Sequence, residues 1–253
     1  MGWINASTLP DYFYEGAAVV YDGKIYIIGG GGSSSTYAYW DGSNWIQNSL
    51  GFSFSQSKAA VVYNNKIHVF GGNSNNKLHK SFDGSAWADE EAIPYNFYCS
   101  SAVVYNNKIH LLGSRATGQM TKHYSWDGIE WVQESTLPYS FRNGDAVVYD
   151  NKIHILGSGV SLQEKKHYSW DGSQWSEEST LPNDFKYGSA VVKDNKIHIM
   201  GGGSYATKHS AWDGTSWATE PDLPYTMDDG SAVVYGDYIH ILGSYISANS
   251  KKH

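Results

Sequence analysis

The sequence has little cysteine, little arginine and no long apolar run. Its one cysteine, Cys99, cannot form an intramolecular disulfide or build a thiolate metal site. Two arginines, Arg115 and Arg142, and a formal charge of −7 argue against the clustered basic face that nucleic acid requires. No run approaches the roughly 18 apolar residues of a membrane span, and no signal peptide is recognisable. We therefore expect no nucleic-acid or membrane partner, and the sequence indicates no compartment.

What the sequence does contain is a repeat. With 41% hydrophobic residues in 253, it has ample apolar surface for a folded core. A tripeptide Ala-Val-Val recurs every 42 to 44 residues, beginning at Ala18, Ala60, Ala102, Ala146, Ala190 and Ala232. A tryptophan recurs in the same phase, and these structural residues are Trp3, Trp45, Trp87, Trp131, Trp175 and Trp217. Six repeating units follow from this self-similarity.

Each repeating unit reads as four short strands. In one unit, residues 145–149 form an apolar β-branched run, Asp150-Asn151 suits a tight hairpin turn, and 153–156 form a second run. Residues 167–170 then predict a third strand, and a fourth surrounds Trp175. A four-stranded unit of about 42 residues is typical of a propeller blade, because one small twisted sheet can bury both faces by stacking in a ring.

At these residues the sequence resembles the kelch-repeat β-propellers, of the galactose oxidase and kelch-like superfamily. The family motif places a glycine pair after the second strand, as at Gly29-Gly30, Gly71-Gly72 and Gly201-Gly202. It is weakened to Gly-Ser at Gly113, Gly157 and Gly243. The resemblance covers essentially the whole chain and implies an all-β, six-bladed propeller of four-stranded kelch-type blades.

The ends of the chain suggest how such a ring closes. Residues 3–10 align with 131–138, which contain a predicted fourth strand and its exit loop. We therefore expect residues 1–10 to complete the last blade as its outer strand, with Trp3 buried there. The whole chain, 1–253, is then a single domain whose blades start near residues 17, 59, 101, 145, 189 and 231.

One face of this ring varies from unit to unit. The hairpin turns on the other face hardly change, whereas the loops between blades and between second and third strands differ in length and type. Variable loops on a rigid scaffold are where binding groups usually lie. The candidate ligand-binding residues on this variable face are Tyr14, Glu15, Tyr98, Arg115, Arg142, Asn143, Lys186, Tyr187, Asp228 and Asp229.

The ten histidines form a repeating set rather than a metal site. Five lie in predicted second strands and five begin predicted third strands, while Tyr26 and Tyr37 replace both in the first unit. Paired exchange indicates cross-strand neighbours. Zinc needs three or four ligands, and no cysteine or aspartate recurs beside them. We expect no metal and no cofactor. Some proteins of the family that the sequence resembles are copper oxidases, but every histidine here belongs to the repeating set.

We interpret the chain as a non-catalytic recognition or scaffold module, acting as a monomer. It would bind a carbohydrate or peptide on the variable loop face over the central channel. Two alternatives stay open: a repeat scaffold with no ligand of its own, engineered or excised from a longer array, and a sugar-processing enzyme. The resemblance implies the second, since some kelch proteins isomerise sialic acid and arginine suits its carboxylate.

Overall fold

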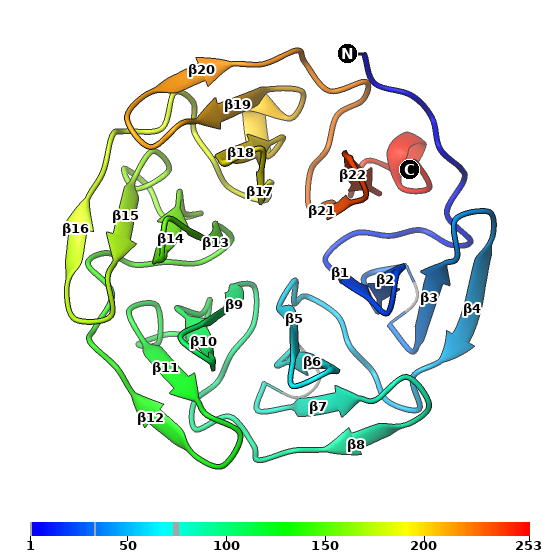
Figure 1. Cartoon of the computed structure of the whole chain (residues 1–253), viewed down its shortest axis with the longest axis horizontal. Coiled ribbons are helices and arrows are strands. Elements are labelled where there is room, and N and C mark those ends of the chain that lie inside the picture. Colours follow the sequence, from blue (N-terminus) through cyan, green and yellow to red (C-terminus); the bar gives the residue numbers. More distant parts are fainter. Residues whose placement is uncertain (1, 33, 73–75) are drawn as a thin grey trace.

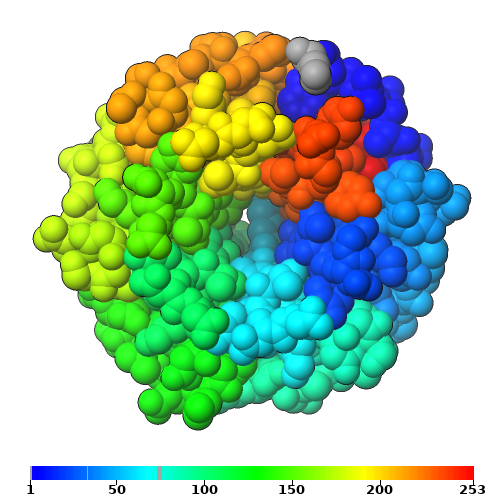
Figure 2. Space-filling model, viewed as in Figure 1, coloured from blue at the N-terminus to red at the C-terminus, as the bar shows by residue number. Residues whose placement is uncertain are grey.

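The protein is a ring of small sheets around a central channel (Figure 1). The structure, a computed structural model, describes residues 2–32, 34–72 and 76–253. Each sheet begins at the channel and runs outward, and the opening at the centre of the ring is visible in the space-filling view (Figure 2). Valines of the innermost strands line this channel. No helix in the described residues is long and apolar enough to span a membrane.

The strands occur in the same order in every unit. The innermost strands are β1 (Ala17–Tyr21), β5 (Ala60–Tyr63), β9 (Ser101–Tyr105), β13 (Asp145–Tyr149), β17 (Ser189–Lys193) and β21 (Ser231–Tyr235). The second strands are β2 (Lys24–Ile28), β6 (Lys66–Phe70), β10 (Lys108–Leu112), β14 (Lys152–Leu156), β18 (Lys196–Met200) and β22 (Tyr238–Leu242). Tight turns join each pair, and residues such as Asn64 and Asn65 adopt the positive φ that these turns require.

The outer strands complete five of these sheets. The third strands are β3 (Thr36–Trp40), β7 (His79–Phe82), β11 (His123–Trp126), β15 (His167–Trp170) and β19 (His209–Trp212). The fourth strands are β4 (Trp45–Ser49), β8 (Trp87–Asp89), β12 (Trp131–Gln133), β16 (Trp175–Glu177) and β20 (Trp217–Thr219). Two short 3₁₀ helices are η1 (Gly203–Tyr205) and η2 (Ser247–Asn249). Neighbouring strands within each sheet are antiparallel, so each sheet is a simple meander.

The prediction of six four-stranded blades is wrong. Within the described residues, five sheets have four strands and one, β21–β22, has two. We call the five complete sheets blades 1 to 5, in chain order from β1–β4 to β17–β20. The two-stranded sheet lies between blade 5 and blade 1 (Figure 1). The fourth-strand sequence at residues 3–5 is present, but with no third strand beside it in the described chain it forms no ladder and is not a strand.

The N-terminal segment nevertheless lies where fourth-strand exits lie in complete blades. The amide of Ala6 donates to the carbonyl of His253 at 2.9 Å, as that of Glu178 does to His167 at 2.9 Å in blade 4. An isolated bridge between Thr8 and Lys252 links the two ends of the chain. Backbone hydrogen bonds therefore hold the N-terminal segment against the C-terminal residues of the chain.

Each connection from one sheet to the next is fixed by a glycine that lies against the carbonyl of a phenylalanine or, at Gly201, of Met227. Gly71, which follows β6, has a φ of 66°, and a Cβ atom built on it would lie 1.8 Å from the carbonyl oxygen of Phe97. No residue but glycine fits such a contact. Phe97 is fully buried in the loop that leads to blade 3. The same contact joins Gly243 to Phe13, so the N-terminal segment replaces an inter-blade loop at the two-stranded sheet.

Histidines and tryptophans fill the space between neighbouring sheets. In blade 3, His110 Nδ1 and His123 Nε2 are 2.9 Å apart, and Trp170 of blade 4 lies edge-on at 4.8 Å from the His123 ring. Burial lowers the pKa of His110 to about 4, so the pair is neutral and structural near neutral pH. The prediction that these histidines are cross-strand neighbours is confirmed. Among the described residues, no group of three metal-ligating side chains forms a cation site.

Trp3 is half-buried rather than buried, like the five tryptophans that begin the fourth strands. Its ring lies 5.8 Å from that of His209, as the ring of Trp175 does from His123. We therefore expect Trp3→Ala to lower the free energy of unfolding by about 2 kcal/mol, less than for a fully buried tryptophan. Thermal melting should show a fall of several degrees. Ile4→Ala, at a side chain that is 79% exposed, is the control, and an equal melt for both variants would contradict this placement.

Candidate functional site at the channel mouth

Six connecting loops converge on one end of the channel. Each contains a residue with positive φ two positions after the junction phenylalanine or, in the last loop, Met227: Glu15, Gln56, Cys99, Asn143, Tyr187 and Asp229. We call this group, with Lys58 and Arg115, the channel mouth. Glycine, asparagine and aspartate adopt such a backbone most readily, whereas Glu15, Gln56, Cys99 and Tyr187 hold a conformation that is uncommon for their residue types and that clusters at functional sites.

Backbone hydrogen bonds link these residues once around the channel. The amide of Glu15 donates to Asp229 (2.9 Å), Asp229 to Tyr187 (2.7 Å), Tyr187 to Asn143 (2.7 Å), Asn143 to Cys99 (2.8 Å), Cys99 to Gln56 (2.9 Å), and Ser57 to Glu15 (3.2 Å). The ring is continuous past the two-stranded sheet, because Asp229 precedes β21. It therefore holds the side chains of the mouth at fixed positions around the axis.

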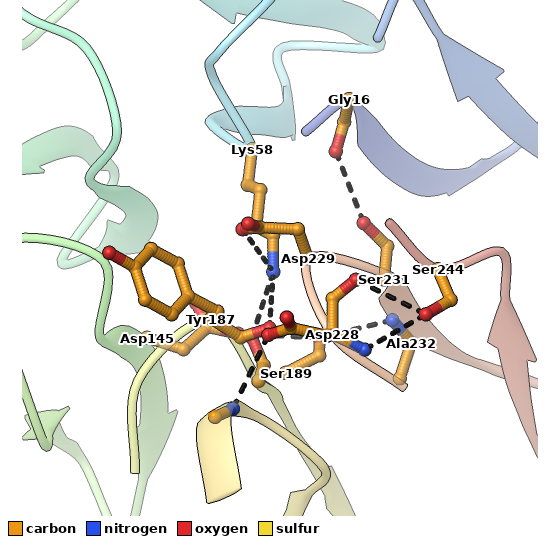
Figure 3. A network of polar contacts seen from close by, with 12 residues as sticks. Gly16, Lys58, Asp145, Tyr187, Ser189, Asp228, Asp229, Ser231, Ala232 and Ser244 are labelled. Atoms are coloured by element: carbon orange, nitrogen blue, oxygen red, sulfur yellow. Dashed lines mark hydrogen bonds and ion pairs between the residues drawn. The ribbon is translucent and has the colours of Figure 1, made fainter. Parts of the chain in front are cut away.

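Lys58 spans the mouth from one side to the other. Its Nζ donates to the carbonyls of Tyr187 (3.3 Å) and Gly188 (3.0 Å), which belong to the loop that enters blade 5, and lies 3.8 Å from a carboxylate oxygen of Asp229 (Figure 3). Lys58 enters from the loop before blade 2. The lysine thus spans part of the channel mouth, and the hollow beside it leaves room for about two water molecules.

A second aspartate, Asp145, interacts with Lys58 near the channel mouth. Asp145 begins β13, and its carboxylate accepts hydrogen bonds from the Ser101 hydroxyl (2.9 Å) and from the amide of Ala190 (2.8 Å) in the next blade. Burial raises the pKa of Asp145, while these donors and Lys58 oppose the shift. Asp145 therefore joins blades 3, 4 and 5 at the channel.

Burial raises the pKa values of the acidic groups in the channel mouth. It raises the pKa of Asp229 to about 7, although Lys58 favours the ionised form, and Glu15 adds to the rise. It also raises the pKa of Glu15, against the pull of Arg115 and Lys58. The Cys99 thiol has a pKa of about 11, because burial outweighs its hydrogen bond with Arg115. The cysteine is therefore a protonated thiol and a poor nucleophile at neutral pH.

Five of the predicted site residues line the hollow together: Glu15, Arg115, Asn143, Tyr187 and Asp229. Four others point away from it. Tyr14 packs on Tyr245, with ring centroids 5.2 Å apart, and an Arg142 nitrogen donates to the Gly159 carbonyl at 3.4 Å. Lys186 lies 3.9 Å from Glu164, and Asp228 accepts from the amide of Gly203 at 3.3 Å. Tyr98 does not line the hollow either.

This division has a simple cause. Tyr14, Tyr98, Arg142, Lys186 and Asp228 each precede the positive-φ residue of their loop, and the reversed backbone turns successive side chains to different sides. The first of each pair contacts the loop after a second strand, and the next one faces the channel. Sequence comparison placed both residues on the variable face without separating the two directions.

Sequence reasoning missed Lys58, Gln56 and Asp145. Counting back from Ala-Val-Val aligns Gln56 with Tyr14, whereas the structure places Gln56 with Glu15. The reason is one extra residue, since Ala59 follows Phe54 by five positions and Ala17 follows Phe13 by four. Counting forward from the phenylalanine would have revealed Lys58 as an insertion that blade 2 alone carries.

Comparison with known proteins establishes the fold and no family. No family model matches the sequence, and no curated protein matches it. Among solved structures, that of YjhT superposes with a TM-score of 0.80, covering 97% of this chain and 94% of that chain. The chain is a β-propeller. At 14% identity this similarity shows the fold alone, so membership of the kelch family stays a prediction.

The acidity of Asp229 predicts how stability depends on pH. In the unfolded chain its carboxyl ionises near pH 4, whereas in the folded protein it stays protonated up to about pH 7. The folded state therefore binds the additional proton between these values, and stability is lost as the pH rises through them. The loss is about 1.4 kcal/mol for each pKa unit. We expect Asp229→Asn to melt like the wild type at pH 4 and well above it at pH 8.

Thermal melting between pH 4 and pH 8 measures this difference, with Asp237→Asn, at an exposed turn, as the control. An Asp229→Asn variant that is no more stable than the wild type at pH 8 would show that Lys58 holds the carboxylate ionised instead.

Proposed function

We propose that the protein is a non-catalytic recognition module, of the kelch type, that binds a carbohydrate or peptide carrying a carboxylate at its channel mouth. The observation that carries this proposal is the convergence of unlike side chains in an otherwise repetitive ring. Arg115, Asn143, Tyr187 and Asp229 come from different loops and line one hollow, while the strands behind them repeat. Packing explains the residues that repeat from unit to unit, whereas the residues that differ between units and meet at the channel mouth support a binding role.

Arg115 is the residue that supports a carboxylate ligand. It is exposed, and among the described residues no ion pair occupies its guanidinium. A guanidinium binds a carboxylate through two parallel hydrogen bonds. Tyr187 offers an aromatic face and Asn143 an amide, which are groups suited to sugar rings and peptide bonds.

The small size of the hollow supports binding of one functional group of a ligand rather than enclosure of a whole sugar ring. With Lys58 across the channel, there is space for about two water molecules beside it. A carboxylate or hydroxyl fits there, and the rest of a ligand would lie over the mouth. The raised pKa of Cys99 removes the thiolate that nucleophilic catalysis would use.

A sugar-processing enzyme is the second candidate, and Asp229 favours it. A carboxyl with a pKa of about 7 beside a lysine can donate and accept protons at neutral pH. Turnover of an acidic sugar that is lost in Asp229→Asn, while binding persists, would replace the recognition role by this one.

Screening against glycan arrays and peptide libraries, followed by titration calorimetry, tests the recognition role. We expect Arg115→Gln to weaken binding of a carboxylate ligand at least tenfold, because a charge-assisted bidentate contact is lost. Arg142→Gln is the matched control, since Arg142 is the other arginine and contacts its own blade. Wild-type protein that binds no member of either library, or an Arg115→Gln variant that binds equally well, would contradict the proposal.

A further inference from the structure

Two aspartates near the channel differ in how their carboxylates are bonded. That of Asp145 accepts three hydrogen bonds, from the Ser101 hydroxyl (2.9 Å) and from the amides of Ala146 (2.9 Å) and Ala190 (2.8 Å). The carboxyl of Asp229 accepts none within the described chain, although its side chain is only 18% exposed. Burial without donors makes the ionised form unfavourable, so the protonated form of Asp229 is favoured unless a ligand completes the site.

Lys58 does not supply the missing donor to Asp229. An ammonium group has three donors, and Lys58 directs two of its own to the carbonyls of Tyr187 (3.3 Å) and Gly188 (3.0 Å) (Figure 3). Its Nζ lies 3.8 Å from a carboxylate oxygen of Asp229, which is too long for a hydrogen bond. The lysine therefore offsets part of the negative charge of the mouth and leaves the Asp229 carboxyl open to a ligand.

Glu15 is a second carboxyl of this kind. Its amide donates to the Asp229 carbonyl at 2.9 Å, so the two residues are neighbours in the ring of hydrogen bonds around the channel. Both line the same hollow, and within the described residues no hydrogen bond or ion pair holds the Glu15 carboxylate. Two ionised carboxylates beside a space for about two water molecules repel each other, which favours the protonated form of one of them.

The titratable and charged groups around Asp229 come from several loops of the mouth. They are Lys58, Arg115, Glu15, Asp228 and Cys99. The two cations favour an ionised Asp229, the two carboxyls disfavour it, and the thiol is neutral. Burial outweighs the cations and raises the pKa of Asp229 to about 7. Near neutral pH, therefore, a small change in its surroundings decides whether Asp229 carries a proton.

The function proposed above brings a ligand carboxylate to Arg115, in the hollow that Asp229 also lines. An ionised Asp229 would repel that carboxylate across so small a space. A protonated Asp229 instead donates its O–H to a ligand oxygen, and such charge-assisted bonds are about twice as strong as neutral ones. The same side chain therefore opposes the ligand in one protonation state and binds it in the other.

We propose that Asp229 is a specificity-determining residue of the channel mouth, which takes up a carboxylate ligand together with one proton. Arg115 binds the carboxylate through its guanidinium, while the protonated Asp229 donates a hydrogen bond to the same group. The proton comes from the solvent, and no covalent bond of the ligand changes. A neutral amide takes up no proton and accepts weaker hydrogen bonds, so the site selects a carboxylate over its amide. This inference rests on the proposed function, from which it takes the carboxylate ligand.

Carboxylate binding should weaken as the pH rises through the pKa of Asp229. Below about pH 7 the residue already carries the proton that the complex requires. Above this value the proton must be taken from the solvent, so the affinity falls by about tenfold for each pH unit until the pKa of the complex is reached. By the same linkage, a bound carboxylate raises the pKa of Asp229.

NMR titration of the wild-type protein with acetate, a carboxylate small enough for the hollow, tests this inference. The amide resonances of Arg115 and Tyr187 report binding at pH 6 and pH 8.5, and acetamide is the neutral probe. We expect the apparent Kd for acetate to be at least about tenfold higher at pH 8.5 than at pH 6, and weak binding of acetamide that is independent of pH. The carboxyl-carbon resonance of Asp229 should titrate at a higher pH when acetate is present.

Two neighbouring aspartates of one loop give matched variants. Asp229→Asn keeps an N–H donor and loses the titrating group. We expect its Kd for acetate to change by no more than about threefold between the two pH values, and to be lower than that of the wild type at pH 8.5. Asp228→Asn is the control and should keep the tenfold dependence, because the Asp228 carboxylate accepts from the Gly203 amide at 3.3 Å and does not line the hollow.

The outcomes separate this inference from the function on which it rests. If acetate shifts no resonance of the channel mouth at either pH, the carboxylate site itself is wrong, and both proposals fail. Acetate binding that Arg115→Gln abolishes, but that is equally tight at pH 6 and pH 8.5, would overturn the inference and leave the proposed function standing. An Asp229→Asn variant with the full pH dependence of the wild type would also overturn it.

Discussion

The structure depends on the contact between a left-handed glycine and the carbonyl of the junction phenylalanine. At Gly71 and Phe97 the two backbones approach so closely that any side chain on the glycine would collide with the carbonyl. The contact fixes where one sheet ends and the next begins, and it recurs at each connection around the ring. It persists at Gly243 and Phe13, where the N-terminal segment takes the place of an inter-blade loop. A regular ring therefore forms although one of its sheets has two strands.

The same junction positions the channel mouth. Two residues after each junction residue the backbone turns left-handed, and its amide bonds to the neighbouring loop, which carries Glu15, Asn143, Tyr187 and Asp229 to the axis. The junction residue that packs and the residue that lines the channel mouth are thus two positions apart in one loop. Lys58, one inserted residue, reaches across the mouth from this loop to the Gly188 carbonyl.

Much of this architecture could be predicted from the repeat. Local signals place the strands, the tight turns and the histidine pairs correctly, because each unit repeats the same alternation and the same turn residues. The blade count was wrong because a fourth strand needs a third strand to pair with, and residues 3–5 have none in the described chain. Side-chain direction at the mouth depends on one backbone reversal. Tyr14 and Glu15 are neighbours in sequence yet face different sides, and no composition or spacing signal reports that reversal.

Within the described chain, β22 pairs with β21 on one side and with no third strand on the other, and this distinguishes the sixth sheet from the five complete blades. Native-state amide hydrogen exchange tests it directly, by comparing Tyr238–Leu242 with Lys152–Leu156 of blade 4. In β14 both edges are paired, so all its amides should be strongly protected. The account predicts that the amides of β22 that point away from β21 exchange orders of magnitude faster than their counterparts. Equal protection along both strands would contradict it.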